Sequence, residues 1–311
     1  MSFFVGIFQK HDVIIATSPQ FFTTWSGWAL SKIRRKPWIF ELRDLWPESI
    51  KTVGAMKQGR VIDLLEKIEL GLYKSCNKVV AVTDAFKNNL ITRGIRKDKI
   101  EVITNGSNME LFYPREADTH LLNSLDLKGK FVVGYIGTHG MAHSLDFIVR
   151  SIARVSDPSI HFLFIGDGAM KRKIVKISKE LQLKNISFID PVSKDEVPRY
   201  LSIIDISLAP LKKDDNFKTV IPSKIFESSA MQKPTLLGVQ GQAQEILDKY
   251  GAGICFEPEN EVDFIEKLSI LRDVSFYQKC QDGCADLAAD YDRKKLADKM
   301  LDVIDKIVKD Q

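Results

Sequence analysis

The stretch "FVVGYIGTHGMAHSL" (131–145) runs from apolar and β-branched residues, through a glycine-containing loop, to an expected helix start. Its first half is typical of a buried strand. Gly137 and Gly140 allow the backbone to approach a ligand, and a helix beginning near His143 and Ser144 would point its positive end at the loop. The stretch therefore predicts a strand, loop and helix of a parallel sheet. The loop is either a phosphate cradle or a turn that uses glycine only for its geometry.

The same alternation continues along most of the chain and predicts an α/β protein with parallel strands. The expected strands fall into two series, at 12–18, 37–43, 78–83 and 99–104, and then at 131–137, 160–166, 186–190, 205–210, 234–239 and 253–257. The segment "TNGSNMELFYPREAD" (104–118), rich in Asn, Gly and Pro, separates them. We therefore expect two Rossmann-like domains, residues 1–115 and 116–288.

The two ends of the chain carry further expectations. The first series has only four strands, whereas a complete first half of such a domain would add roughly 90 residues. The N-terminal domain is therefore expected to be incomplete, with its first segment truncated. Residues 289–311 are expected to form a helix that crosses back to the N-terminal domain, with one apolar face made of Leu296, Met300, Leu301, Ile304 and Ile307.

Composition excludes several classes of protein. The 45 basic and 41 acidic side chains give a formal charge of only +4, which does not favour nucleic-acid binding. Four scattered cysteines without a CxxC pair indicate neither a disulfide framework nor structural zinc, and they fit a reducing cytoplasm. No apolar run approaches the roughly 20 residues of a membrane span. A cytoplasmic protein is expected, and its modest basicity suits peripheral contact with anionic lipid or phosphate.

Two further segments could bind an anion. In "DGAMKRK" (167–173), one of the three basic side chains would point inward, or all three would be solvated. In "VIPSKIFESSAMQKP" (220–234), Ser223 can cap a helix whose first-turn amides are expected to be unsatisfied, and Lys224 adds a positive charge. Glu227, one turn inside, suits the two hydroxyls of a ribose; the alternative is a surface carboxylate that stabilises the helix dipole.

These segments, together with "ATSPQFF", "FELRDLWPES", "ITNGSNMELFYP" and "FIGDGAMKRKI", resemble the glycosyltransferase family 4 enzymes of the GT-B fold. "RDLWPES" and "PSKIFE" are especially similar to a bacterial subgroup that builds O-antigen, capsule and other surface polysaccharides, including transferases of N-acetyl-L-fucosamine. The resemblance implies two Rossmann-like domains that face a cleft. It also implies retaining transfer of a sugar from a UDP-sugar to a lipid-linked acceptor at the inner membrane face, without a metal or other cofactor.

The resemblance also assigns residues. The nucleotide-sugar diphosphate is expected at Gly137, Thr138, Ser223, Lys224 and the basic pair Lys171 and Arg172, and the ribose at Glu227. His143 is nearest to the family's loop lysine. Arg43, Asp44 and Glu48 are expected to face the acceptor and the donor sugar.

Thr219 departs from the family pattern, and Asp214 and Asp215 raise the question of a metal site. Thr219 stands where the family's first glutamate is expected, so contacts to the transferred sugar differ. Asp214 and Asp215 are expected to be solvated loop charges rather than metal ligands. The alternatives are a nucleotide-sugar-binding protein without catalysis and a GT-B epimerase of UDP-sugars.

Overall fold

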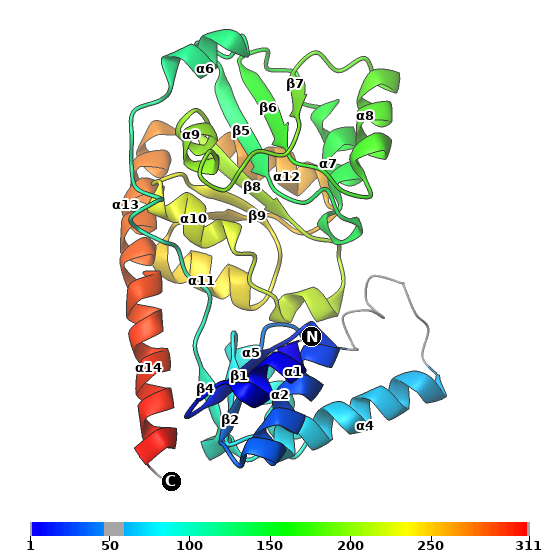
Figure 1. The fold of residues 1–311 in the computed structure, drawn as a ribbon. Coiled ribbons are helices and arrows are strands. Elements are labelled where there is room, and N and C mark those ends of the chain that lie inside the picture. Colours follow the sequence, from blue (N-terminus) through cyan, green and yellow to red (C-terminus); the bar gives the residue numbers. More distant parts are fainter. Residues whose placement is uncertain (1, 47–58, 310–311) are drawn as a thin grey trace. The chain divides into compact units, whose positions relative to one another are not determined.

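The computed structural model describes residues 2–46 and 59–309 (Figure 1). The chain divides into two compact units, one made of residues 1–105 with 294–311 and the other of residues 106–293. The dividing points therefore lie at 105 and 293, where the sequence predicted 115 and 288. All ten expected strands are present, and each is shorter than or equal to its predicted range.

The first unit is built on a parallel sheet in the order β1-β2-β3-β4. Its elements are α1 (Ser2–Phe8), β1 (Ile14–Thr17), α2 (Phe21–Arg34), β2 (Trp38–Leu42), α4 (Arg60–Ser75), β3 (Lys78–Ala81), α5 (Asp84–Thr92), the 3-10 helix η1 (Lys97–Lys99), β4 (Ile100–Val102) and most of α14 (Arg293–Lys309). One core lies under α4 and α5, where the buried rings of Trp38, Phe40 and Tyr73 meet.

Helix α14 packs on this sheet through most of the predicted face, with Met300, Ile304 and Ile307 in the contact, but the prediction included Leu301 and missed Val303. Val303 and Ile307 are buried against Ile39 and Val80 of the central strands. Leu301, which the sequence placed on the packed face, is 54% exposed. The helical period explains the error, because positions 296, 300, 303 and 307 share one side of the helix and position 301 lies off it.

The second unit contains six parallel strands in the order β10-β9-β8-β5-β6-β7. Its elements are α6 (Thr119–Ser124), β5 (Phe131–Ile136), η2 (Met141–His143), α7 (Leu145–Ile152), β6 (Ile160–Ile165), α8 (Lys171–Glu180), β7 (Ile186–Ile189), α9 (Val197–Ser202), β8 (Ile206–Pro210), η3 (Asp215–Thr219), α10 (Lys224–Ala230), β9 (Thr235–Gly238), α11 (Gln242–Tyr250), β10 (Gly253–Cys255), α12 (Glu261–Ile270) and α13 (Val274–Asp290). Numbered from β5, this is the Rossmann order 3-2-1-4-5-6, and the order reverses between β5 and β8.

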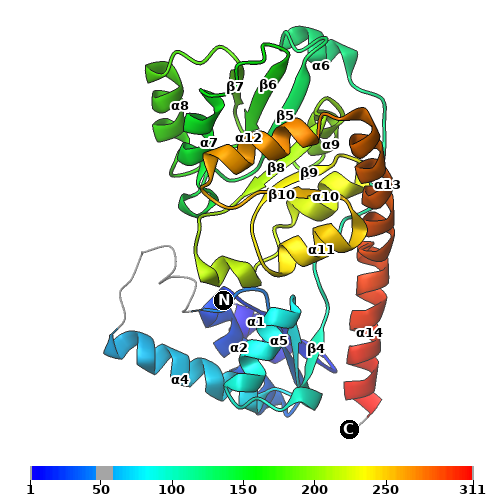
Figure 2. The same cartoon turned by 180° about the vertical axis from the view of Figure 1, so that it is seen from behind.

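Both faces of this sheet are covered, which is why its strands are almost uniformly apolar. Tyr135 and Phe164 belong to the core beneath α7, α8 and α12, whereas Leu163 and Ile165 belong to the core beneath α6 and α9. Helix α12 lies in front of the sheet in Figure 2, and α9 lies in front of it in the opposite view of Figure 1. Successive side chains of a strand point to opposite faces of the sheet, so neighbouring residues lie in different cores.

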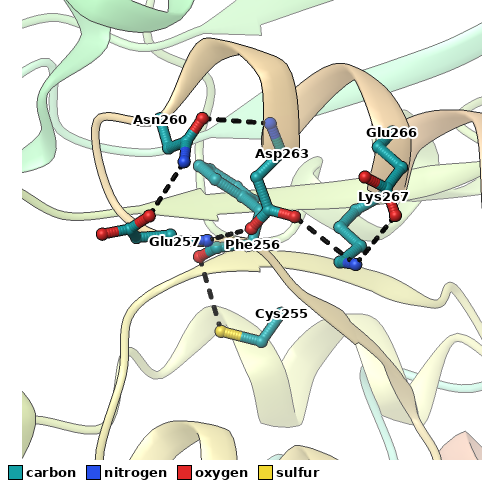
Figure 3. Close-up of polar contacts among 7 residues, drawn as sticks. All are labelled: Cys255, Phe256, Glu257, Asn260, Asp263, Glu266 and Lys267. Carbon is teal, nitrogen blue, oxygen red and sulfur yellow. Dashed lines mark hydrogen bonds and ion pairs between the residues drawn. The ribbon is translucent and has the colours of Figure 1, made fainter.

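The start of α12 illustrates how polar side chains fix a helix on this sheet (Figure 3). The side chain of Asn260 accepts a hydrogen bond from the Asp263 amide at 3.1 Å, as an N-cap does. The carboxylate of Asp263 in turn accepts the Glu257 amide at 2.6 Å and pairs with Lys267 at 3.4 Å. These contacts hold the end of β10 and the first turn of α12 together. Among the described residues, no helix is both long and apolar enough to cross a membrane.

Candidate functional site

A pocket of about 260 Å³ lies in the second unit, at the carboxyl end of β5. We call it the β5–α10 pocket; it is lined by Ile136, Gly137, Thr138, Val197, Leu201, Ser207, Ser223, Lys224, Glu227 and Ser228. Because β5 and β8 flank the point where the strand order reverses, this is the position at which open α/β sheets bind ligands. The pocket unites five of the predicted site residues, from the glycine loop and from α10.

Lys224 is the cation of this pocket, and it is half-buried. Its ammonium lies 4.7 Å from the centre of the Tyr135 ring. It makes no ion pair with a carboxylate in the part of the chain that the structure describes. Removal from water lowers the pKa of Lys224 to about 8, against the opposing effect of Glu227. The pocket therefore holds a positive charge that the protein itself does not neutralise.

Glu227 lies one turn further along α10 and lines the same pocket. Burial raises the pKa of its carboxyl group, and the nearby charges of Lys194, Lys224 and Arg293 oppose the shift. Among the described residues its carboxylate has no hydrogen-bond donor. Its two oxygens are therefore available to accept hydroxyl groups of a ligand.

The start of α10 differs from the prediction in two respects. The Ser223 hydroxyl makes no capping hydrogen bond. The amide of Ile225 donates to the Pro222 carbonyl at 3.2 Å, and that of Phe226 donates to the Ser223 carbonyl at 3.1 Å. The expectation of unsatisfied first-turn amides is wrong for these two, because a tight turn before the helix uses them. The side chain of Lys224 is the stronger feature of this segment.

The start of α7 has an acidic neighbour. Ser144 precedes the helix, and its hydroxyl donates to Glu259 Oε1 at 2.6 Å. A protein carboxylate thus already lies beside the first turn of α7, where the dipole favours an anion. The phosphate cradle stays a prediction for this loop, which lines the pocket through Gly137 and Thr138.

Two predicted basic ligands do not line the pocket. The ammonium of Lys171 donates to the carbonyls of Gly166 and Ile189, both at 2.8 Å, and so joins the ends of β6 and β7. Arg172 is exposed on the first turn of α8. The Lys171 ammonium already has two backbone acceptors, so in this structure it joins two strand ends and does not line the pocket.

His143 is also separate from the lining of the pocket. Its ring packs against Tyr135 with the centroids 6.1 Å apart, and its Nδ1 atom is buried without a hydrogen-bond partner. Burial, together with the charge of Lys224, lowers the pKa of His143 to about 4. The imidazole is therefore neutral at pH 7 and adds no positive charge to the site.

Arg43 and Asp44 lie in the first unit, directly after β2. The Arg43 guanidinium pairs with Glu41 at 3.0 Å, and its amide donates to Ser18 Oγ at 3.0 Å. Asp44 is half-buried, and its carbonyl accepts from Ser18 Oγ at 3.4 Å. Both residues follow the carboxyl end of a parallel strand, as expected. Glu48 lies outside the described residues.

The two aspartates of the loop between β8 and α10 contact other residues of the same loop. Asp214 caps η3 by accepting the Asn216 amide at 2.9 Å, and Asp215 pairs with Lys218 at 2.7 Å. The Thr219 hydroxyl donates to the Asn216 carbonyl at 2.8 Å. In the described part of the chain, no group of three or more His, Cys, Asp or Glu residues is placed to hold a metal ion.

Sequence reasoning missed Tyr135 and Ser207, which lie in strands rather than in loops. Ser207 lines the pocket from β8, and Tyr135 lies under Lys224 from β5. A polar residue inside an otherwise apolar strand was the available signal for both, since such strands are normally apolar throughout.

Two stretches of the chain match known family models. Residues 4–111 match the model of Glycosyltransferase Family 4, and residues 130–273 match that of Glycosyl transferases group 1. The chain is 26% identical over 232 residues to TuaH of Bacillus subtilis, named for teichuronic acid biosynthesis, and covers 56% of its length. It is 24% identical over 260 residues to WcaI of Escherichia coli, named for colanic acid biosynthesis, and covers 64% of it. These alignments include 73% and 81% of this chain.

The fold also matches a solved structure. Anabaena Alr3699/HepE, in complex with UDP and glucose, superposes with a TM-score of 0.78 at 16% sequence identity. The match covers 95% of this chain and 78% of HepE. At this identity the likeness establishes the fold. The fold is therefore of the GT-B type, and residues 4–111 and 130–273 are each similar to a glycosyltransferase family model.

Proposed function

We propose that the chain is a retaining glycosyltransferase that moves a sugar from a UDP-sugar to a lipid-linked saccharide in the assembly of a bacterial surface polysaccharide. The names of TuaH and WcaI support the pathway class, and the UDP held by HepE supports the donor class. The resemblance of "RDLWPES" and "PSKIFE" to N-acetyl-L-fucosamine transferases favours an N-acetylated amino sugar. The lipid-linked acceptor implies peripheral contact with the inner face of the membrane.

The unpaired charge of Lys224 carries this proposal. Negative charge accumulates on the diphosphate as the sugar leaves, and a fixed cation in a partly desolvated pocket stabilises that charge more strongly than a solvated one. A diphosphate bound beside Gly137 and Thr138 would supply the anion that Lys224 lacks. Because Lys224 supplies this charge, we propose that no metal is required, so that treatment with a chelator leaves the rate unchanged.

Glu227 is the proposed ribose ligand. Its carboxylate lines the same pocket one helical turn from Lys224, and no described residue donates to it. Two adjacent hydroxyls can donate to its two oxygens. In the first unit, we propose Arg43 and Asp44 as the residues that contact the acceptor and the transferred sugar.

Calorimetric titration with UDP tests the donor site. We expect Lys224→Met to weaken UDP binding by roughly 10- to 100-fold, the value of a hydrogen bond to a charged group. Lys176→Met is the matched control, because Lys176 lies on α8 and pairs only with Glu180. Equal affinity of the wild type and Lys224→Met would contradict the assignment.

Transfer is tested separately from binding. The full chain is incubated with a panel of UDP-sugars and polyprenyl-diphosphate-linked saccharides, and products are separated by mass. UDP binding without any product across the panel would favour the alternative of a nucleotide-sugar-binding protein. Inversion at the anomeric carbon would contradict the retaining mechanism.

A further inference from the structure

Tyr135 lies behind the β5–α10 pocket and contacts two of its parts. Its side chain is fully buried in β5. Its hydroxyl donates to the Thr138 carbonyl at 2.6 Å, and its ring lies 4.7 Å from the Lys224 ammonium. One side chain thus contacts both the glycine loop and the cation of the pocket.

The hydroxyl of Tyr135 completes the fixation of a loop peptide. The peptide group between Thr138 and His139 has its carbonyl held by Tyr135, and its N–H donates to the Asp167 carbonyl at 2.8 Å. Both polar atoms of this peptide are therefore used. The orientation of this peptide is therefore fixed by Tyr135 of β5 and by Asp167, which follows β6, and not by hydrogen bonds to water.

Gly137 makes the space that the Lys224 ammonium occupies. A Cβ atom at position 137 would lie 2.6 Å from Lys224 Nζ, and the φ angle of this residue is +142°. Only glycine adopts such a backbone without strain. The ammonium therefore fits between the backbone of Gly137 and the face of the Tyr135 ring.

We propose that Tyr135 is a positioning residue: its ring holds the ammonium of Lys224 at the pocket without neutralising it, and its hydroxyl fixes the loop that carries Gly137 and Thr138. A carboxylate in this place would pair with Lys224 and compete with an anionic ligand. The face of an aromatic ring attracts a cation but carries no net charge, so the full charge of Lys224 stays available. This inference rests on the proposed donor site.

The ionisation of Lys224 can be measured separately from that of the two imidazoles that pack against Tyr135. The rings of His139 and His143 pack against Tyr135, and burial lowers the pKa of each to about 4. Lys171 is close enough to influence His139, and Glu227 influences Lys224 from the same helix. Since the pKa of each imidazole is about 4 and that of Lys224 is about 8, the titration of Lys224 is separate from theirs.

The first experiment measures the pKa of Lys224 in the ligand-free full chain, by NMR of protein labelled with ¹³Cε-lysine. Tyr135→Phe keeps the ring and should leave the pKa of Lys224 within a few tenths of the wild type. Tyr135→Leu removes the ring and should lower this pKa by roughly half to one unit. Phe164→Leu is the matched control, because Phe164 is a buried ring beside Tyr135 without contact to Lys224.

The second experiment measures UDP affinity at pH 7 for the same variants. Tyr135→Phe should bind UDP a few-fold more weakly, because Thr138 loses its hydrogen bond, and Tyr135→Leu should bind more weakly still. Calorimetric melting shows which variants are folded, and only those variants are titrated.

The outcomes separate this inference from the proposed function. An unchanged Lys224 pKa in Tyr135→Leu, or an equal shift in Phe164→Leu, would overturn the role of the ring. A Tyr135→Phe variant with wild-type affinity would overturn the role of the hydroxyl. If the wild type bound no UDP, the donor site itself would be wrong, and the NMR titration would still decide whether the ring holds the cation.

Discussion

Lys224 in the second unit and Glu69 in the first are both ionisable side chains withdrawn from water, and the protein treats them in opposite ways. Glu69, 3% exposed, pairs with Arg93 at 3.0 Å and accepts the Tyr73 hydroxyl at 2.5 Å. Lys224 makes no ion pair with any described carboxylate and rests on an aromatic ring. Glu69 lies on α4 and pairs with Arg93 at the end of α5, whereas Lys224 lines a pocket.

The difference separates a charge that serves the fold from one that serves a ligand. A buried charge is costly unless it is paired and hydrogen-bonded, and Glu69 has both kinds of partner. Lys224 lacks the ionic partner at the one edge of the sheet where a ligand is expected. Each prediction below changes one side of this comparison.

The largest expected effect is on stability, from Arg93→Met. Removing the guanidinium leaves the Glu69 carboxylate buried and uncompensated, which should lower the free energy of unfolding of the first unit by about 3 kcal/mol at pH 8. All four tryptophans, at positions 25, 28, 38 and 46, belong to the first unit, so their fluorescence in urea reports on this unit.

The pH dependence sharpens that prediction. Burial raises the pKa of Glu69 to about 7 from 4.5, so the folded state binds its proton more tightly than the unfolded state does. The stability that protonation of Glu69 adds to the folded state is therefore present at and below pH 4.5 and is lost as the pH rises through 7. The effect of Arg93→Met should be clearly smaller at pH 5 than at pH 8, and Glu69→Gln should flatten the wild-type profile. An effect of Arg93→Met that does not depend on pH would contradict this description of the pair.

The next effect is on ligand binding by Lys224. Its pKa is lowered to about 8, and an anion binds the protonated form. UDP affinity should therefore fall about tenfold between pH 7 and pH 9, following the loss of that proton. Calorimetry at several pH values measures it, and Lys224→Met should show a flat profile. A wild-type profile as flat as that of the variant would exclude Lys224 as the ligand.

A smaller effect is expected from Glu227→Gln. The amide keeps one acceptor and loses the charge, so UDP affinity should fall by roughly three- to tenfold, as expected for one or two weakened hydrogen bonds. Glu245→Gln is the matched control, since Glu245 is likewise acidic in the first turn of its helix, α11, but is exposed. If Glu227→Gln loses affinity only for nucleosides that carry a ribose diol, the assignment of Glu227 to the ribose is supported. If it loses affinity for inorganic pyrophosphate as well, that assignment is contradicted.

The smallest effect is expected at the start of α7. Glu259 accepts the Ser144 hydroxyl there, and neither residue lines the pocket. Glu259→Gln should therefore change UDP affinity by less than about twofold, because the amide oxygen can still accept that hydrogen bond. A large gain in affinity would show that the carboxylate had been excluding the ligand from this helix.

The sequence predicted the strands well because the apolar runs of a covered parallel sheet are short and sharply bounded. It also placed Gly137, Thr138, Ser223, Lys224 and Glu227 together, since the carboxyl ends of β5 and β8 meet at one edge of the sheet. The order of the elements along the chain and the rule for ligand sites in open sheets indicated where to look, and the family resemblance assigned these residues to one ligand.

Side-chain partners could not be predicted in the same way. Lys171 and Lys224 both follow a strand, yet Lys171 donates to two backbone carbonyls and pairs with Asp190, whereas Lys224 has no ion pair with a described carboxylate. The same limit applies to Ser144, whose partner Glu259 is 115 positions away in the chain. Such contacts depend on the packing of distant segments, which periodicity and spacing do not encode.

We propose that the positive charge of Lys224 binds the diphosphate of the donor. The most direct measurement is the NMR titration of ¹³Cε-labelled Lys224 in the full chain, with and without saturating UDP. A bound anion within about 4–6 Å should raise the pKa of Lys224 from about 8 by at least one unit. A pKa that remains about 8 in the presence of bound UDP would contradict the claim.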